Sequence, residues 1–396
     1  MAKKRIYLTV LISVILCTCL IAGCGEEESD SVNPNGEDTN VSNNNDSDST
    51  PTSTGSWLVR KVIPDSPFKP PSIEGVVDGI VAELNKVPHN PQMKLSFMPK
   101  ELTGFWETTI DGAADAFTEL QVISTTVAPE EADVEDFDAG AAQAALIDER
   151  IAQGYAGIGV ASHNDTIVPS IDAAVAAGMT VITFDSDEPD SARQLYIGTI
   201  NTSAGKTGGE TLANLLGANT GTVIVLGFDD IGWVGGYERT HAAADALTAA
   251  GQTVSIYHTD WTDQSLNEAG MVEIMQTADP PVIGCIGVFS NAHLCASAAD
   301  IAGVADSVTN VAFDFEAETI AFMEAGKISA THVQRQYYMG YVVPYLLYAS
   351  QVLGMDQVRT LAAGIMLDAE TIDTGLDVVT PDTLDVYYTF MNSLTL

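Results

Sequence analysis

Residues 180–189 read TVITFDSDEP, and residues 308–318 read VTNVAFDFEAE. Each stretch is an apolar, β-branched run typical of a strand, and each run ends at a carboxylate, Asp185 in the first and Asp314 in the second. An Asp after a strand is usually a turn former or a helix N-cap. An acid at the end of a buried strand can also belong to a binding site, so the rest of the chain decides between the two interpretations.

Similar apolar runs recur along most of the chain and alternate with helical stretches rich in Ala, Leu and Glu. Continuous apolar runs indicate strands that are buried on both faces, as in parallel sheets covered by helices. The predicted fold class is therefore α/β, with two doubly wound parallel-sheet lobes joined by a multi-segment hinge. The runs are MKLSFM at 93, AGIGVAS at 156, MTVITF at 179, GTVIVLGF at 221, PVIGCIGVF at 281 and VTNVAF at 308.

In such folds ligands bind beyond the carboxyl ends of the strands. Asp185 and Asp314 occupy this position, which favours a binding role. We expect Asp185 to close a strand of the N-terminal lobe and Asp314 a strand of the C-terminal lobe, so that the two acids face one cleft from opposite sides.

The composition narrows the class of partner. The 396 residues are 46% hydrophobic and 18% charged, enough to bury one large or two ordinary cores. The formal net charge is -38, and the acids are spread along the whole chain. A nucleic-acid partner requires clustered Lys and Arg, so this composition argues against one.

The first 24 residues resemble a bacterial lipoprotein signal: KKR at 3–5, an apolar run over 6–20, and IAGC at 21–24. In such a signal the small residues admit the signal peptidase and the Cys thiol takes a diacylglycerol. The alternative is an ordinary signal peptide or an N-terminal membrane helix. We expect residues 1–23 to be the signal peptide and Cys24 to be lipidated, which anchors an extracytoplasmic protein to a membrane, in the periplasm or on the cell surface.

Segment boundaries follow from shifts in composition. Residues 24–56 are polar and should form a disordered tether that spans on the order of 30 Å. An N-terminal extension over 57–92 contains SIEGVVDGIVAELN, an amphipathic helix expected to dock on the main domain, with a partner surface as the alternative. The predicted N-terminal lobe comprises 93–201 and 335–365, and the predicted C-terminal lobe comprises 202–334 and 366–396.

The cysteines and enzyme motifs give weaker signals. Cys285 and Cys295 are expected to be buried free thiols, although an oxidising compartment would allow a disulfide, and their spacing from His293 is not typical of zinc. AGKTGG at 204 is not a P-loop, because Ile200 stands where that motif needs Gly, and neither HExxH nor GxSxG occurs. Paired acids leave a carbohydrate-active enzyme as a minor alternative. We expect no enzyme activity, no metal and no cofactor.

From residue 93 to about 353 the order of segments resembles the periplasmic sugar-binding proteins of the ribose-binding type, which have the type I solute-binding fold. The resemblance is carried by FMPKELTGFWETTIDGA, DERIAQGYAGIGVAS, MTVITFDSD, IGTINTSAGKTGG, GGYERTHAAADAL, GVFSNAHLCASAA, VAFDFEAE and ISATHVQRQYYMG.

This resemblance implies roles for the matching residues. Phe105 and Trp106 match the aromatic pair that stacks on a sugar ring. The family's polar groups that bind sugar hydroxyls match Asp185, Arg239, Asn291, Asp314 and Gln334. Trp261 and Trp233 follow strand-like runs and could add a second aromatic face, with core or rim packing as the alternative.

Three positions depart from the family. The resemblance implies Asn, Arg and Asp at three positions where this chain has Thr103, Ser186 and Ala292. A pocket lined by these residues, Thr103 among them, would make fewer polar contacts with a sugar than the pocket of a ribose-binding protein does. The three differences therefore argue against ribose as the ligand. The remaining residue types still suit a neutral polyol: carboxylates accept from hydroxyls, Arg, Asn and Gln donate to them, and an aromatic face covers the apolar side of the ring.

We therefore expect a lipid-anchored, monomeric solute-binding protein that captures a small neutral sugar or polyol by hinge closure and delivers it to an ABC importer. The alternative is a sugar-sensing protein that presents its closed form to a chemoreceptor or a sensor kinase. The sequence leaves open which sugar binds, which membrane holds the anchor, and what residues 57–92 do.

Overall fold

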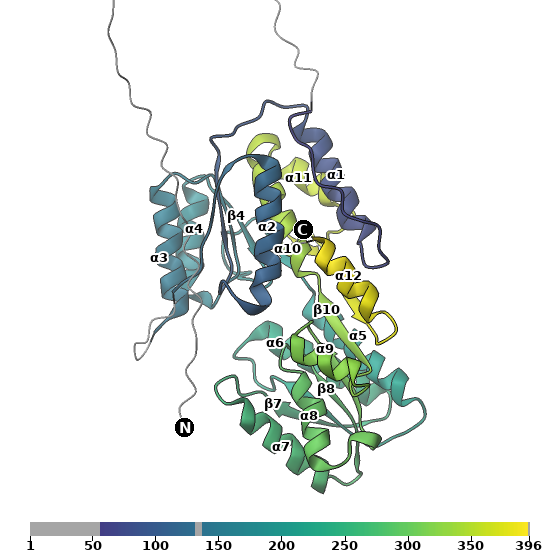
Figure 1. The fold of residues 1–396 in the computed structure, drawn as a ribbon. Helices are drawn as coiled ribbons and strands as arrows, with labels where there is room; N and C mark the ends of the chain where they lie inside the picture. Colours follow the sequence, from purple (N-terminus) through teal and green to yellow (C-terminus); the bar gives the residue numbers. More distant parts are fainter. Residues whose placement is uncertain (1–55, 131–136, 395–396) are drawn as a thin grey trace, which may run out of the picture. The chain divides into compact units, whose positions relative to one another are not determined.

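The computed structural model describes residues 56–130 and 137–394 (Figure 1). The expected signal peptide, Cys24 and nearly all of the expected tether lie outside this part of the chain. Within it, no helix has both the length and the apolar character needed to cross a membrane.

The first sheet contains six strands in the order β11-β5-β4-β3-β1-β2, and every neighbouring pair is parallel. All residues of β4 are buried, as its continuous apolar run predicts. The strands are β1 (Lys94–Met98), β2 (Ile123–Thr126), β3 (Gly157–Val160), β4 (Thr180–Phe184), β5 (Leu195–Gly198) and β11 (Thr371–Asp373).

The second sheet also has six strands, in the order β12-β10-β9-β8-β6-β7. Its neighbours are parallel except at one edge, where β12 runs antiparallel to β10. The strands are β6 (Thr222–Gly227), β7 (Thr253–His258), β8 (Val282–Gly287), β9 (Thr309–Phe313), β10 (Ala330–Gln334) and β12 (Leu376–Val379). The prediction of two doubly wound α/β lobes is confirmed, and the antiparallel strand β12 is an addition to it.

Helices cover both faces of each sheet. In the N-terminal lobe, built on the first sheet, α2 and α10 lie on one side of β4, and α3 and α4 lie on the other (Figure 1). The helices of this lobe are α2 (Glu107–Leu120), α3 (Ala139–Ala152), α4 (Val168–Ala176), α10 (Gln336–Leu353) and α11 (Met355–Ala362). Those of the C-terminal lobe are α5 (Asn201–Leu216), α6 (Val234–Ala249), α7 (Gln264–Thr277), α8 (His293–Ala302) and α9 (Ala317–Glu324).

The chain passes between the two sheets three times, after β5, after β10, and between β11 and β12. The first two crossings follow Gly198 and Gln334. Thr371–Asp373 pairs with β5 of the first sheet, whereas the sequence assigned residues 366–396 to the C-terminal lobe. Three crossings give a hinge made of several segments.

Helix α10 is the centre of the N-terminal lobe, and all its residues from Gln336 to Ala349 are buried. Its tyrosine hydroxyls donate to acids of α2: the hydroxyl of Tyr337 lies 2.7 Å from Asp115 Oδ2, and that of Tyr341 lies 2.7 Å from Glu119 Oε2. These bonds satisfy polar groups that would otherwise be costly to bury.

The N-terminal extension docks on the same lobe. Helix α1 (Pro71–Leu84) packs on α10 and α11 through an apolar face that includes Val77 and Ile80. Helix α12 (Leu384–Leu394) lies beside the extension, where the rings of Phe68 and Tyr387 are 4.8 Å apart.

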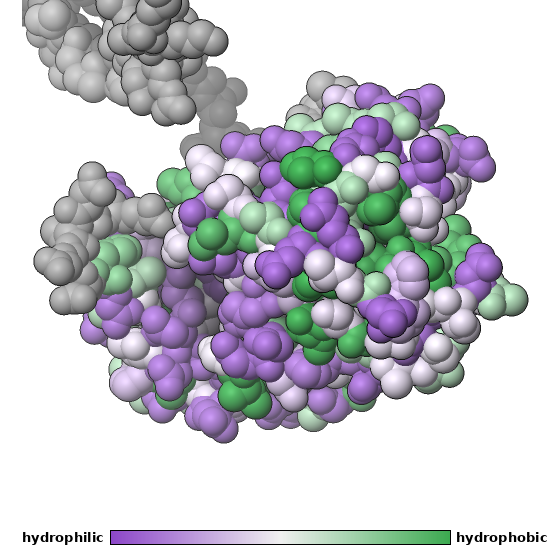
Figure 2. Space-filling model, turned by 90° about the horizontal axis from the view of Figure 1, so that it is seen from below, coloured by the Kyte–Doolittle hydropathy of each residue, from purple (hydrophilic) through white to green (hydrophobic). Residues whose placement is uncertain are grey.

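The surface is mostly hydrophilic, and the two cysteines lie in the interior. Figure 2 shows a face on which hydrophilic residues predominate and hydrophobic residues lie in separate patches. Cys285 and Cys295 are both buried and both free.

Candidate functional site

The two acids that end the quoted strands share an unusual backbone conformation. Asp185 follows β4 with φ of 60°, and Asp314 follows β9 with φ of 64°. Of the non-glycine residues in the described ranges, only these two and Gln121 have positive φ. That region is strained for a residue with a Cβ, although Asp tolerates it better than most.

The same set of contacts holds each acid in place. The backbone N–H of Asp185 donates to Ile197 O at 3.1 Å, and its carbonyl accepts from the hydroxyl of Tyr196 at 3.0 Å. The N–H of Asp314 donates to His332 O at 2.9 Å, and its carbonyl accepts from Thr331 Oγ1 at 2.6 Å. In both lobes the neighbouring strand therefore fixes the acid through two successive residues.

The acids that follow Asp185 have partners within the N-terminal lobe. Arg193 donates to both carboxylate oxygens of Asp187, at 2.6 and 2.7 Å. Ser162 Oγ donates to Glu188 Oε1 at 2.6 Å. Asp185 itself accepts from the adjacent Ser186 hydroxyl at 2.9 Å. Asp187 and Glu188 thus stabilise the loop, whereas the carboxylate of Asp185 is bonded to its neighbour Ser186.

A chain of buried polar groups joins three of the predicted site residues. Arg239 Nη2 donates to Gln334 Oε1 at 2.9 Å, and Gln334 Nε2 donates to Asp314 Oδ1 at 3.0 Å. Arg239 is further held by Asn201 Oδ1 at 3.0 Å and by Val288 O at 3.1 Å. The guanidinium is therefore fixed by residues from three different segments, the start of α5, the end of β8 and β10.

Burial and neighbouring charges shift the pKa values of these groups. Burial raises the pKa of Asp314 to about 6, while Arg239 and Gln334 oppose the increase and Asp185 adds to it. Burial also raises the pKa of Asp185, against the effect of Lys100, Ser186 and Arg239. Burial lowers the pKa of Arg239, and Asp314 and Asp185 oppose that change. The two acids and Arg239 therefore influence one another's pKa values.

The side chain of Asn291 uses its donor in the hydrogen bonds of the site but not its acceptor. Its Nδ2 donates to Thr259 Oγ1 at 2.7 Å and to Gln264 Oε1 at 3.2 Å. Its Oδ1 is buried without a hydrogen-bond partner among the described residues. A buried, unpaired acceptor is costly unless a ligand donates to it.

The predicted aromatic residues lie in two groups. Phe105 is half-buried and Trp106 is buried, with ring centroids 5.1 Å apart, in the short helical turn just before α2. In the C-terminal lobe Phe228, Trp233, Trp261 and Phe289 form a cluster, in which Trp261 is 45% exposed and Trp233 is 36% exposed. Both groups leave some aromatic surface uncovered, as a stacking site requires.

Some predicted residues are not joined to the polar chain. Thr103 is exposed in the segment before α2, and Trp261 contacts Phe228 and Phe289 rather than a polar site residue. Conversely, sequence reasoning missed Lys100, Asn201 and Phe289. The available signal for Lys100 was its place just after an apolar strand, the same position that singled out the two acids.

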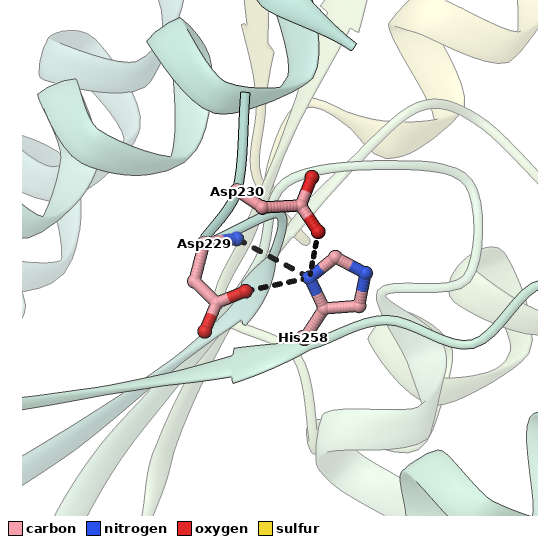
Figure 3. A group of neighbouring side chains, drawn as sticks. All are labelled: Asp229, Asp230 and His258. Carbon is pink, nitrogen blue, oxygen red and sulfur yellow. Dashed lines mark hydrogen bonds and ion pairs between the residues drawn. The ribbon is translucent and has the colours of Figure 1, made fainter. Parts of the chain in front are cut away.

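A second group of polar residues lies at the ends of β6 and β7. His258 Nδ1 lies 2.7 Å from Asp229 Oδ1 and 3.8 Å from Asp230 Oδ2 (Figure 3). All three side chains are exposed. Carboxylates and an imidazole can ligate a divalent cation, but an exposed ion pair accounts equally well for this arrangement.

Two doubly wound lobes, each with an acid in the same constrained position after a parallel strand, define a two-lobed solute-binding protein of type I. The chain belongs to the family described as periplasmic binding protein domain, whose model matches residues 95–352.

Solved structures with this fold include sugar-binding proteins. An ABC transporter solute-binding protein from Burkholderia graminis in complex with D-arabinose is 25% identical, with a TM-score of 0.62, over 74% of this chain and 98% of that one. An arabinose-binding protein from Geobacillus stearothermophilus is 26% identical, with a TM-score of 0.63, over 75% of this chain and 100% of that one. The XylFII-LytSN complex, 22% identical with a TM-score of 0.57 over 74% and 98%, shows the fold alone. None of the curated proteins compared with the chain matches it.

Proposed function

We propose that the protein binds one small neutral sugar or polyol per chain between its two lobes and releases it unchanged. The observation that carries this proposal is the chain from Arg239 through Gln334 to Asp314, together with Asp185 in the equivalent position of the other lobe. Family membership and the two arabinose-binding relatives support a sugar as the class of ligand.

The hydrogen-bonding capacity of the site suits hydroxyl groups. Gln334 occupies Oδ1 of Asp314, which leaves Oδ2 to accept from a ligand. Asn291 Oδ1 is a second acceptor, and Arg239 is a donor held by its neighbours. A sugar hydroxyl both donates and accepts, so it can satisfy each of these groups. Each hydrogen bond to a charged group contributes about 1.5 to 3 kcal/mol. Once water is excluded from the site, a few such bonds therefore account for most of the affinity for the sugar.

The proposal extends to transport of the bound sugar. Cys24 would be the lipidated first residue of the mature protein, residues 24–56 its tether, and an ABC importer the recipient of the sugar. Sensing is the second candidate, supported by the XylFII-LytSN complex, in which a protein of the same fold is seen with another protein. Both functions require the same ligand residues.

A screen of pentoses, hexoses and polyols by thermal shift tests the proposal. We expect at least one sugar to raise the Tm, because a ligand that binds only the native state stabilises it. The bound sugar should be recovered chemically unchanged. Formation of a new product by the pure protein would favour the enzyme alternative, and a screen without any stabilising sugar would contradict the proposal.

The anchor is tested separately. A Cys24→Ala protein should leave the membrane fraction or retain its signal peptide, because no thiol remains to be lipidated. The fraction bound to membranes and the mass of the N-terminal peptide are the measurements. A fully processed, membrane-bound Cys24→Ala protein would show that Cys24 is not the anchor.

A further inference from the structure

We propose that Arg335 is a positioning residue: it connects the three crossings of the hinge to one another and thereby holds Gln334 in the geometry that a sugar requires. This inference rests on the proposed function and extends it to a residue that the sequence pattern did not single out. The guanidinium of Arg335 bonds to the third crossing and to β12, so Arg335 acts on the ligand through other residues.

The three crossings are joined by hydrogen bonds that centre on Thr374. This residue lies in the third crossing, between β11 and β12. Its N–H donates to Gly198 O, where the first crossing begins, at 3.0 Å. Its carbonyl accepts from Nη1 of Arg335, in the second crossing, at 2.9 Å. One residue of the third crossing is therefore bonded to both of the others, and the side chain of Arg335 supplies one of these two bonds.

An ion pair fixes the guanidinium in this position. Nε and Nη2 of Arg335 both donate to Oδ1 of Asp377, at 3.0 and 2.7 Å. The side chain of Arg335 is 21% exposed and that of Asp377 is 6% exposed. Beside them lies a cavity of about 10 Å³, lined also by Tyr387 and Phe390 of α12, which barely holds one water molecule. Solvent therefore screens this pair weakly, and loss of one partner would leave a buried charge without compensation.

The ion pair lies next to the polar chain of the site. Arg335 directly follows Gln334, the residue that connects Arg239 to Asp314. The pairing of β10 with β12 extends to Gln334, and Asp377 belongs to β12. The bond from Arg335 to Asp377 thus holds the end of β10 against β12. Without it, we expect the side chain of Gln334 to move relative to its two partners.

Gly375 offers an independent way to displace the guanidinium. Its φ of 72° lies in the left-handed region, and a Cβ added there would lie 2.7 Å from Nη1 of Arg335. Nη1 is the end of a flexible side chain, so the added methyl group would displace the guanidinium from Thr374 O. Gly326 is the matched position, because its φ is 71° and nothing lies within 4 Å of an added Cβ.

Binding of D-arabinose, measured by calorimetry, tests the positioning role. Arg335→Lys keeps the charge but replaces the planar fork by a point charge, which cannot bond to Thr374 and Asp377 in the same geometry. Gly375→Ala keeps Arg335 and changes its position. We expect each substitution to weaken binding at least tenfold.

Two control variants carry the same substitutions away from the hinge. Arg60→Lys alters a pair with Glu74 in the N-terminal extension, at 3.1 Å and with side chains 11% and 12% exposed, and Gly326→Ala introduces the same backbone strain. Both should bind within threefold of the parent. The free energy of unfolding of all four variants shows whether affinity is lost at a loss of stability that the controls share. Parent-like affinity in both hinge variants would overturn the proposal.

Hydrogen–deuterium exchange without sugar separates this inference from the proposed function. Arg335→Lys should make exchange at least threefold faster in peptides that cover 371–377 and also in those that cover 196–201, whereas Arg60→Lys should leave both like the parent. If the parent bound no D-arabinose, that choice of ligand would be contradicted, and exchange would still decide whether Arg335 connects the crossings. Faster exchange confined to the peptides around residue 335 would overturn the proposal.

Discussion

Asp185 and Asp314 combine a positive φ with a carboxylate that is half-buried at Asp185 and buried at Asp314, and burial of the carboxylate is not expected of an ordinary turn former. Each acid is locked by an N–H and a carbonyl contact to the neighbouring strand, so the surrounding structure maintains the strain. Such strain persists where a fold imposes it, and it is concentrated at functional sites. The binding interpretation therefore explains more of what is seen at these residues than the turn-forming one does.

Substitution by Asn separates charge from backbone strain. Asn tolerates positive φ as Asp does, so Asp185→Asn and Asp314→Asn should keep the free energy of unfolding near that of the parent. Loss of a charged acceptor should weaken sugar binding by about 1.5 kcal/mol or more, roughly tenfold. The corresponding Ala variants should lose a further ~1 kcal/mol of stability from backbone strain.

Calorimetry and denaturant unfolding of the four variants test this separation. Asn variants that bind the sugar as tightly as the parent would restore the turn-forming interpretation. Ala variants as stable as the Asn variants would show that the left-handed conformation is relaxed in solution.

The raised pKa of Asp314, about 6, predicts two pH dependences of opposite sign. The folded protein binds this proton more tightly than the unfolded chain, where the pKa of Asp is about 3.9, so the contribution of Asp314 to stability is fully present below about pH 4 and is lost as the pH rises to about 6. Sugar affinity should increase over the same rise, because an ionised carboxylate accepts more hydrogen bonds than a protonated one.

Affinity and Tm measured between pH 4 and pH 7 on the parent and on Asp314→Asn test both dependences. The difference between the two proteins isolates Asp314 from the other acids. Parallel profiles would show that this carboxyl does not titrate in the site in that range.

The two acids of the candidate site could be predicted from the sequence. Asp185 and Asp314 stand at the ends of apolar runs, a pattern visible in one dimension. The effect of Lys100 on the pKa of Asp185 could not be predicted, because it depends on which strand ends share an edge of the sheet. The role of Asn201 in holding Arg239 depends likewise on the packing of α5 against α6.

At the scale of elements, α5 and α6 position Arg239 through a close approach of their backbones. A Cβ added at Gly205 would lie 2.0 Å from the carbonyl oxygen of Arg239, and one at Gly209 would lie 2.5 Å from that of Ala243. Glycine allows this approach because it has no side chain. The glycine-rich start of α5, which resembled a phosphate-binding loop, is instead a packing surface for the helix that carries Arg239.

Gly205→Ala should therefore move α6 and impair the site as well as the core. Overpacking of this kind costs about 1 to 3 kcal/mol of stability, and the displaced Arg239 should also weaken sugar binding. Gly75→Ala is the control, since it lies in α1 with nothing within 4 Å of the added Cβ and should stabilise its helix by about 0.5 to 1 kcal/mol. Denaturant unfolding and calorimetry are the measurements, and a Gly205→Ala protein that matches the parent in both would contradict this role.

The elements differ in how well the sequence predicted them. Strands β3, β4 and β8 are continuous apolar runs buried in their sheets, which is the signal that sequence reasoning uses. Strands β11 and β12 are short and contain Asp373 and Asp377, so neither has a clear apolar pattern. For this reason the third crossing between the sheets was misplaced.

At the scale of the whole molecule, the N-terminal extension and α12 connect the lobes. Lys61 Nζ donates to Leu394 O at the end of α12 and pairs with Asp115 of α2. Tyr387 of α12 contacts Phe68 of the extension and Phe315 of the C-terminal lobe, each with ring centroids 4.8 Å apart. Because Phe315 directly follows Asp314, these contacts also support one wall of the site.

The central claim is that a sugar binds between the two lobes and draws them together. Small-angle scattering of the purified protein during a sugar titration tests it most directly, because closure changes the radius of gyration while binding outside the cleft does not. We predict that the radius of gyration falls and saturates at one sugar per chain, and that Asp185→Asn and Asp314→Asn show little compaction. A sugar that binds tightly while the radius of gyration stays constant, or equal compaction in both variants, would contradict the claim.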